Sequence, residues 1–302
     1  MGFLRYLLST GPKHLWWLAY IVGAIISLRK YFFTLERRMD CSAYEALLLR
    51  REGHVLHATM NRPETMNAID AQLDAELIRL FVEVADDPET RVVVLTGAGK
   101  AFSAGGDIDS IQALIDEPWR MYDMIPRAKR LISNLLDCPK PVIAKVNGHA
   151  VGLGATLALF CDLVFANPTA KIADPHVTLG LVAGDGGAII WQQLIGHVRA
   201  KEYLFTGDPI SGEEAARIGL INRAVPLDEL DAAVESFAQR LANQPARALQ
   251  WTKLVANMPL KTQAAAMMDA GIAYEALSNQ SEDHRLAVQA MVEKRKPSFT
   301  GN

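Results

Sequence analysis

The chain has 302 residues, half of them hydrophobic, so it can bury a large core and form one domain with an appendage. Its formal net charge of −3 at pH 7 argues against a basic nucleic-acid surface, and we expect no nucleic-acid partner. Three cysteines without framework spacing indicate reduced thiols and a cytoplasmic location. No Cys/His cluster in the sequence has metal-ligand spacing, which predicts no metal.

The first forty residues differ in character from the rest. An uncharged run of 14 residues, 15–28, lies between Lys13 and the pair Arg29 and Lys30. A spanning helix needs about 20 apolar residues, so this run is short for a membrane span. Three interpretations stay open for residues 1–38: membrane contact, a start-site artefact, or contact with a partner or second copy. We assign 1–40 as an extension outside the core.

From residue 44 onward, strand and helix patterns alternate. Residues 44–60 predict a β-hairpin that turns at Glu52 and Gly53. Asp70 is expected to cap a helix, and the apolar run 91–96 (RVVVLT) predicts a buried parallel strand. The strand–strand–helix order recurs through 141–161 and 163–196. The predicted apolar face of the Asp70 helix consists of Leu73, Leu77, Leu80, Phe81 and Val84.

Two glycine-bearing turns follow buried strands. Residues 97–108 read GAGKAFSAGGDI, and residues 141–162 read PVIAKVNGHAVGLGATLALFCD. Backbone N–H groups at a helix start lack intrahelical acceptors and favour negative charge. N–H groups from two such turns can converge on one oxygen, which is the arrangement of an oxyanion hole.

The C-terminal region is predicted to be helical. Ser211 and Glu214 form a capping box, with Gly219 as a stop. Beyond Pro226 and Pro245, the pattern predicts helices at 227–242, 246–257 and 262–293.

Several motifs appear together in a familiar order: MNRPETMNAI at 60–69, the two glycine segments, GLVAGDGG at 180–187 and MVEKRKPSF at 291–299. In this order the chain resembles the crotonase (enoyl-CoA hydratase/isomerase) superfamily from residue 44 to 302. The resemblance implies an α/β fold with a spiral of ββα units over 41–226 and a helical trimerisation subdomain over 227–302. It also implies a homotrimer or a dimer of trimers and an acyl-CoA substrate. Coenzyme A would be part of that substrate, with no separate cofactor.

The resemblance assigns functional positions to the glycine segments. It implies an oxyanion hole formed by the backbone N–H groups of Gly106 and Leu153. Coenzyme A would be held largely through backbone atoms, at positions that the family motif matches. These positions are Met66, Ala68, Ser103, Gly105, Gly106 and Ile108.

Two positions depart from the family pattern. The hydratases place two glutamates on a water molecule, and the matching residues here are Thr156 and His176. A threonine hydroxyl cannot act as a general base near neutral pH without an activator. We therefore expect poor activity on crotonyl-CoA. A packed helix residue is the simpler interpretation of Thr156.

His176 and Asp185 lie nine residues apart and are our candidate acid–base pair. The spacing resembles the His/Asp pair of the β-diketone hydrolases typified by 6-oxocamphor hydrolase. That branch also has a histidine near the oxyanion turn, where this sequence has Leu153. The structural alternatives are a loop histidine bonded to backbone for His176 and a helix-capping acid for Asp185.

Three functions stay open on the sequence. The first is an enzyme of the enoyl-CoA hydratase/isomerase type, a lyase or isomerase of acyl-CoA and fatty acid metabolism that uses His176 and Asp185. The second is a β-diketone C–C hydrolase of the retro-Claisen type. The third is a non-catalytic acyl-CoA-binding scaffold.

Overall fold

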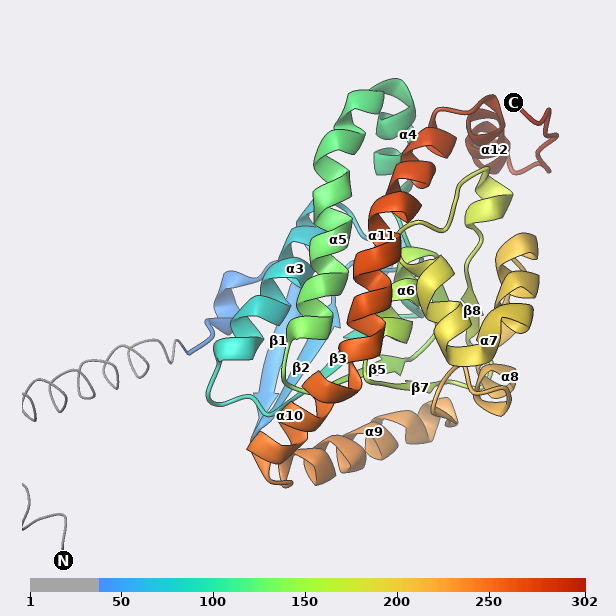
Figure 1. Cartoon of the computed structure of the whole chain (residues 1–302). Helices are drawn as coiled ribbons and strands as arrows, with labels where there is room; N and C mark the ends of the chain where they lie inside the picture. Colours follow the sequence, from blue (N-terminus) through green and yellow to red (C-terminus); the bar gives the residue numbers. More distant parts are fainter. Residues whose placement is uncertain (1–37) are drawn as a thin grey trace, which may run out of the picture.

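The computed structural model describes residues 38–302 of the chain (Figure 1). Residues 1–37, which make up nearly all of the predicted N-terminal extension, lie outside the described residues, so its membrane contact stays a prediction. Within residues 38–302, no helix combines the length and apolar character that a membrane span needs.

The larger of two sheets has six strands in the order β1-β2-β3-β5-β7-β10. β1 and β2 form the predicted antiparallel hairpin, and the remaining neighbours pair in parallel. All of β3 is buried, which confirms the strand predicted at 91–96 to within one residue. The six strands are β1 (Leu47–Glu52), β2 (Val55–Met60), β3 (Val92–Gly97), β5 (Val142–Val146), β7 (Leu163–Ala166) and β10 (Arg223–Ala224).

The smaller sheet has four strands in the order β4-β6-β8-β9. Its first three strands pair in parallel, and each follows a strand of the larger sheet by a few residues along the chain. This repeated step from one sheet to the other gives the predicted spiral of ββα units. The strands are β4 (Ala101–Ser103), β6 (His149–Val151), β8 (Lys171–Ala173) and β9 (Ile210–Ser211).

Helix α3 (Ala71–Asp86) begins where the sequence predicts, because the carboxylate of Asp70 accepts the Leu73 N–H at 2.8 Å. The five apolar residues predicted for its inner face are all buried. This face packs beside α5 (Met121–Asp137) in the main core of the protein.

Four further helices lie between the strands of the smaller sheet and after them. The predicted cap at Ser211 is confirmed, because its hydroxyl accepts the Glu214 N–H at 3.1 Å. Asp107 also caps a helix and accepts the Ser110 N–H at 3.0 Å. Gly219 has φ +81°, as a C-terminal stop requires. These helices are α4 (Ile108–Asp116), α6 (Leu153–Phe160), α7 (Gly187–Thr206) and α8 (Gly212–Arg217).

Four helices complete the chain, and two of them cover opposite sides of the sheets. α9 (Leu227–Ala242) packs on one face of the larger sheet, and α11 (Met258–Asn279) runs beside α5 and α7 (Figure 1). The prediction of a single helix at 262–293 is wrong. The chain breaks after Gln280 because the Ser281 hydroxyl accepts the His284 N–H at 3.1 Å and starts a new helix. The remaining two are α10 (Ala246–Ala256) and α12 (Glu282–Val292).

Candidate active site

The two glycine turns meet at the ends of β4 and β6. Gly105 has φ +94°, and a Cβ on it would lie 2.6 Å from the Val151 carbonyl oxygen and 3.5 Å from the Leu153 nitrogen. Only glycine fits both the backbone conformation and this close approach. The structure therefore brings together the two turns in which the sequence predicts an oxyanion hole.

The N–H groups of these turns are placed for an anion. Leu153 is the first residue of α6, so its N–H has no acceptor within that helix, and the positive end of the helix dipole lies there. Gly106 follows Gly105, whose carbonyl accepts the Ile69 N–H at 2.7 Å. Within residues 38–302, no hydrogen bond is donated by the Gly106 N–H. Gly106 and Leu153 thus present donors from neighbouring turns, as the oxyanion-hole prediction requires.

His176 begins a short 3₁₀ helix, η4 (His176–Leu179), after β8. Its Nδ1 lies 2.5 Å from Oδ1 of Asp174, and its Nε2 lies 3.8 Å from Oδ2 of Asp185. The ring also lies against the oxyanion turn, because a Cβ on Gly152 would come within 3.8 Å of Cε1 of His176. The imidazole therefore connects two carboxylates beside the Leu153 N–H.

The charges around this ring decide its protonation state. Burial alone would lower the pKa of His176, but the carboxylates of Asp174 and Asp185 outweigh burial and raise the pKa to about 10. Burial raises the pKa of the Asp185 carboxyl, against the opposing effect of His176. At neutral pH the ring is an imidazolium, so it starts as a proton donor, and Asp185 is a stronger base than an ordinary aspartate.

Asp185 lies one residue before Gly186, the N-cap residue of α7, and also faces His176. Its Oδ1 accepts the Gly187 N–H at 3.0 Å, at the start of α7. The hydroxyl of Thr156 donates to the same carboxylate, 3.2 Å from Oδ1. Thr156 is thus a buried helix residue, as the simpler interpretation held, and its hydroxyl also touches the candidate base.

Two acids of this cluster are missing from the sequence prediction. Asp174, two residues before His176, makes the hydrogen bond to the ring that the prediction gave to Asp185. Glu275 on α11 is buried, and burial together with the nearby aspartates raises its pKa to about 8 despite the opposing effect of His176. Glu275 is therefore largely neutral at pH 7 and adds little to the negative charge beside His176.

The C-terminal helices hold the loop that carries these groups. A Cβ on Gly184 would lie 2.2 Å from the Gly271 carbonyl oxygen, so α11 contacts the loop backbone directly. The Ser278 hydroxyl accepts the Val182 N–H at 3.1 Å. From α12, Nδ1 of His284 lies 2.7 Å from the Leu179 carbonyl oxygen at the end of η4.

Asp174, His176 and Asp185 also form a set of potential metal ligands, with ligand atoms within 4.8 Å of one another. The two ring nitrogens of His176 face different carboxylates, however, so one ion cannot replace both contacts. This arrangement suits proton transfer better than coordination.

The residues predicted to hold coenzyme A lie on two adjoining segments. The Ala104 N–H donates to the Met66 carbonyl at 2.9 Å, and the Ser103 hydroxyl donates to the Asn67 carbonyl at 2.8 Å. Met66 and Ile108 are about half exposed, whereas Ala68 and Ser103 are buried. The side chain of Ser103 is therefore used inside the fold, and contact with a ligand there would have to come from backbone. The sequence analysis did not name Asn67, which joins these two segments. Its side-chain amide donates to the Ala98 and Ala101 carbonyls at 2.9 Å.

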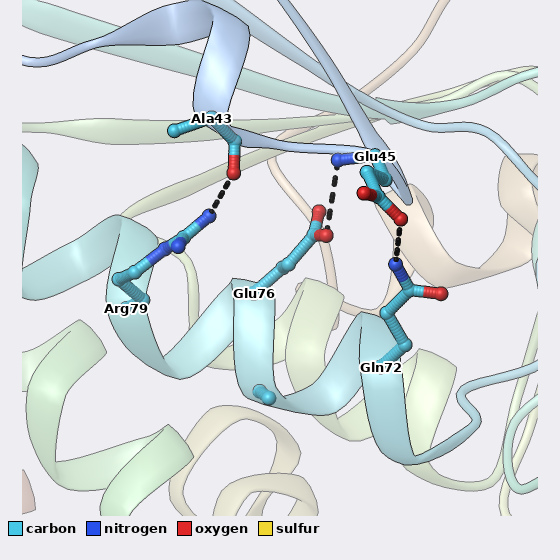
Figure 2. A pocket seen from close by; sticks show the side chains of 6 residues that line it. Ala43, Glu45, Gln72, Glu76 and Arg79 are labelled. Carbon is cyan, nitrogen blue, oxygen red and sulfur yellow. Dashed lines mark hydrogen bonds between the residues drawn. The ribbon is translucent and has the colours of Figure 1, made fainter.

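A separate surface pocket lies between η1 (Cys41–Ala43) and α3 (Figure 2). Its central acid, Glu76, accepts the backbone N–H groups of Glu45, Ala46 and Leu47 at 2.9–3.0 Å. Arg79 donates to the Ala43 carbonyl. The polar groups of this pocket are engaged in holding the start of β1, so it is not a candidate active site.

The arrangement of the sheets and the matched glycine turns agree with the known proteins that this chain resembles. A sequence profile of the family described as Enoyl-CoA hydratase/isomerase matches residues 50–302. The chain belongs to this family. Its fold is the crotonase fold, as the sequence resemblance predicts.

Individual members of this family support the assignment. A crotonyl-CoA hydratase of Syntrophomonas wolfei is 35% identical over 263 residues, covering 85% of this chain and 98% of the relative. A 1,2-epoxyphenylacetyl-CoA isomerase of Escherichia coli K12 is 34% identical over 261 residues, covering 85% of this chain and 99% of the relative. The crystal structure of an enoyl-CoA hydratase/isomerase from Mycobacterium paratuberculosis matches with a TM-score of 0.78 at 36% identity, covering 81% of this chain and 97% of that one.

Proposed function

We propose that this protein acts on an acyl-CoA thioester and stabilises its enolate, with His176 and Asp185 as the proton-transfer pair. The observation that supports this most directly is the position of the His176 ring against Gly152, next to the Leu153 N–H. A thioester oxygen held by the Gly106 and Leu153 N–H groups would put its α-carbon near that ring. Preorganised donors of this kind stabilise the charge that develops in the transition state.

The protonation states suggest a role for each residue. His176, an imidazolium because its pKa is raised to about 10, donates the proton from Nε2 to carbon as the enolate collapses. Asp185, whose pKa burial raises, accepts a proton from water or from the substrate carbon. Proton transfer from Asp185 back to His176 then restores the starting state. Asp174 holds the other ring nitrogen and stabilises the imidazolium.

The same cycle serves either addition of water or movement of a double bond. In hydration, the hydroxide part of water bonds to the β-carbon and the α-carbon receives the proton from His176. In isomerisation, Asp185 removes a proton from one carbon and His176 returns one to another. Thr156 and His176 stand where hydratases carry glutamates, so we expect slow hydration of crotonyl-CoA.

A β-diketone C–C hydrolase is the second candidate. The pairing of His176 with Asp185 in this protein resembles the His/Asp pair of the branch typified by 6-oxocamphor hydrolase. There, water would add to one carbonyl and lose its proton to Asp185. The C–C bond would then break towards the other carbonyl, and His176 would protonate the resulting enolate. This reaction does not require coenzyme A.

The test is deuterium exchange at the α-carbon of a panel of acyl-CoA thioesters in D₂O, followed by mass spectrometry. We expect exchange by the wild-type protein and its loss in His176→Ala, with thioester binding retained. His197→Ala, which changes an exposed histidine of α7, serves as the matched control and should exchange normally.

Three outcomes would overturn the proposal in different ways. Exchange that persists in His176→Ala rules out His176 as the proton carrier. Binding without exchange in the wild-type protein leaves the non-catalytic scaffold. Failure to bind any thioester, together with cleavage of a cyclic β-diketone, establishes the C–C hydrolase.

We further propose that the helical region 227–302 assembles the protein as a homotrimer or a dimer of trimers. Large apolar side chains are exposed on α10 and α11, as a subunit interface requires. They include Trp251, Val255, Tyr274 and Leu277. Light scattering on the eluting protein should give three or six chains, and a monomer would exclude the assembly.

A further inference from the structure

A second cluster of potential ligands lies far along the chain from the residues of the active site, on the face of the larger sheet that α9 covers. In the β1–β2 hairpin, Glu52 is opposite Val55, and His57 follows Val55 by two residues. Side chains two apart in a strand share a face, so Glu52 and His57 project to the same side. Val55 belongs to the apolar cluster beneath α9, which fixes that side as the one facing the helix.

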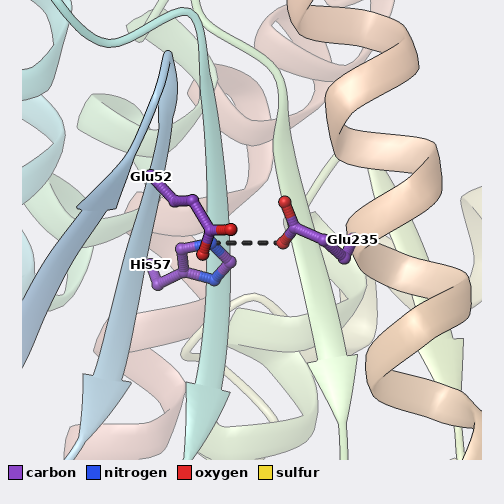
Figure 3. A group of neighbouring side chains, drawn as sticks. All are labelled: Glu52, His57 and Glu235. Atoms are coloured by element: carbon purple, nitrogen blue, oxygen red, sulfur yellow. Dashed lines mark ion pairs between the residues drawn. The ribbon is translucent and has the colours of Figure 1, made fainter.

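Helix α9 supplies the third member of this cluster. Its residue Val234 packs in the same apolar cluster as Val55, and this places the next residue, Glu235, over His57. Oε2 of Glu235 lies 3.3 Å from Nε2 of His57 (Figure 3). One ligand atom from each of Glu52, His57 and Glu235 lies within 4.8 Å of the other two.

The ring of His57 has one nitrogen whose hydrogen-bonding capacity is unused. Its Nε2 is buried and makes no hydrogen bond within residues 38–302, although Oε2 of Glu235 lies 3.3 Å away. The two nearby cations contact carboxylates, both at 2.5 Å: Lys145 contacts Asp231, outside the cluster, and Arg50 contacts Glu52, a member of the cluster.

Glu235 is oriented towards His57 by a bond to its own helix. Gln239, one turn further along α9, donates to Oε1 of Glu235 at 2.9 Å and leaves Oε2 for the histidine. A carboxylate oxygen of Glu235 therefore faces a buried ring nitrogen that makes no hydrogen bond within residues 38–302. A cation between them would satisfy both groups.

We propose that Glu52, His57 and Glu235 form a site for a divalent transition-metal cation, with zinc as the best fit to one imidazole and two carboxylates. Zinc takes such ligands at about 2.0–2.2 Å and accepts water in a fourth position. Glu52 would exchange its contact with Arg50 for the metal. The bound ion would fasten the β1–β2 hairpin to α9, and the site is independent of the proposed reaction on thioesters.

The test is zinc titration of the full chain, stripped of metal, by isothermal calorimetry and thermal unfolding. We expect one zinc per chain and a higher Tm with zinc than without it. His57→Gln and Glu235→Gln should each weaken binding about 100-fold or more, because loss of even an outer-shell partner costs about 10–100-fold. Glu229→Gln is the matched control, since it removes an exposed acid from the same helix without removing a ligand, and should bind like the wild type.

Three results would overturn the site. Zinc affinity that is unchanged in both His57→Gln and Glu235→Gln would show that the ion binds elsewhere. Zinc binding that disappears in His176→Gln, with His57→Gln unaffected, would assign the ion to the cluster around Asp174. Absence of binding by the wild-type chain would exclude the site altogether.

Discussion

The Thr156 hydroxyl and the Asp185 carboxylate are joined 3.2 Å apart across 29 residues of sequence, linking α6 to the start of α7. Both side chains are buried, so the hydrogen bond is made where water does not compete for it. It also favours the charged form of Asp185 and so acts against the effect of burial on its pKa. The pKa of the proposed proton acceptor is thus lowered by a neutral residue, at a position where the sequence resemblance leads us to expect a glutamate in hydratases.

Replacing Thr156 with Val removes this hydroxyl and keeps the side-chain shape. We expect the pH profile of α-proton exchange to move to higher pH, because the pKa of Asp185 rises further. The rate at pH 7 should fall about tenfold, since a hydrogen bond to a charged group contributes about 1.5–3 kcal/mol. Thr156→Ser keeps the hydroxyl and should retain the wild-type profile. Identical pH profiles of exchange for Thr156→Val and the wild type would contradict an effect of Thr156 on Asp185.

Glu275 should make stability depend on pH. Its pKa rises from the ordinary 4.5 to about 8 on folding, so the stabilisation is complete below pH 4.5 and is lost as the pH rises through 8. The unfolding free energy should therefore fall between pH 5 and 8 by up to about 1.4 kcal/mol per pH unit from this group. Urea unfolding of Glu275→Gln should show a flatter decline. Glu229→Gln, at an exposed acid of α9, is the control, and equal slopes in both variants would refute the assignment.

Replacement by alanine should reduce stability much more at Gly184 than at Gly271. A Cβ at Gly184 would meet the Gly271 carbonyl oxygen at 2.2 Å, whereas a Cβ at Gly271 would meet the Gly184 carbonyl oxygen at 3.2 Å. We expect Gly184→Ala to destabilise the protein by about 2–3 kcal/mol, in the range of core overpacking, and Gly271→Ala much less. Chemical denaturation of the two variants measures the difference. Equal stabilities would show that the loop and α11 are not in contact as described.

His284 should affect the rate of the reaction because its hydrogen bond to Leu179 positions η4. Its Nδ1 donates to the Leu179 carbonyl, and its Nε2 lies 3.2 Å from the Asn279 amide. In His284→Asn the side-chain amide can replace the Nδ1 donor, but His284→Gln places its amide one carbon further out. We expect a lower exchange rate for Gln than for Asn, with thioester affinity unchanged in both, measured by exchange and calorimetry. A loss of affinity that matches the loss of rate would assign His284 a general structural role instead.

Local signals in the sequence were sufficient for much of the fold. Asp70, Asp107 and Ser211 each cap the helix that follows them, because a cap depends on residues only three positions apart. The glycine turns were identifiable for a similar reason, since Gly105 needs a positive φ. The helix break at Ser281 was missed because a helical apolar pattern continues on both sides of Ser281, in α11 and in α12.

The active site was only partly predictable. His176 and Asp185 were proposed from the resemblance to the family and from their spacing, and the structure places them 3.8 Å apart. The hydrogen-bond partner of the ring depends on how the chain turns after β8, and it is Asp174. Glu275 has no local signature of burial and reaches the cluster because Gly184 and Gly271 allow α11 to approach. Long-range contacts of this kind are set by tertiary packing, which a single sequence does not display.

The position of Glu275 and His284 on α11 and α12 also bears on how the protein is made. The ribosome synthesises Asp174, His176 and Asp185 well before these two residues. The hydrogen bonds from His284 to η4 and between Ser278 and Val182 can form only after α11 and α12 have been synthesised. The proposed site can therefore be completed only when nearly the whole chain has been made.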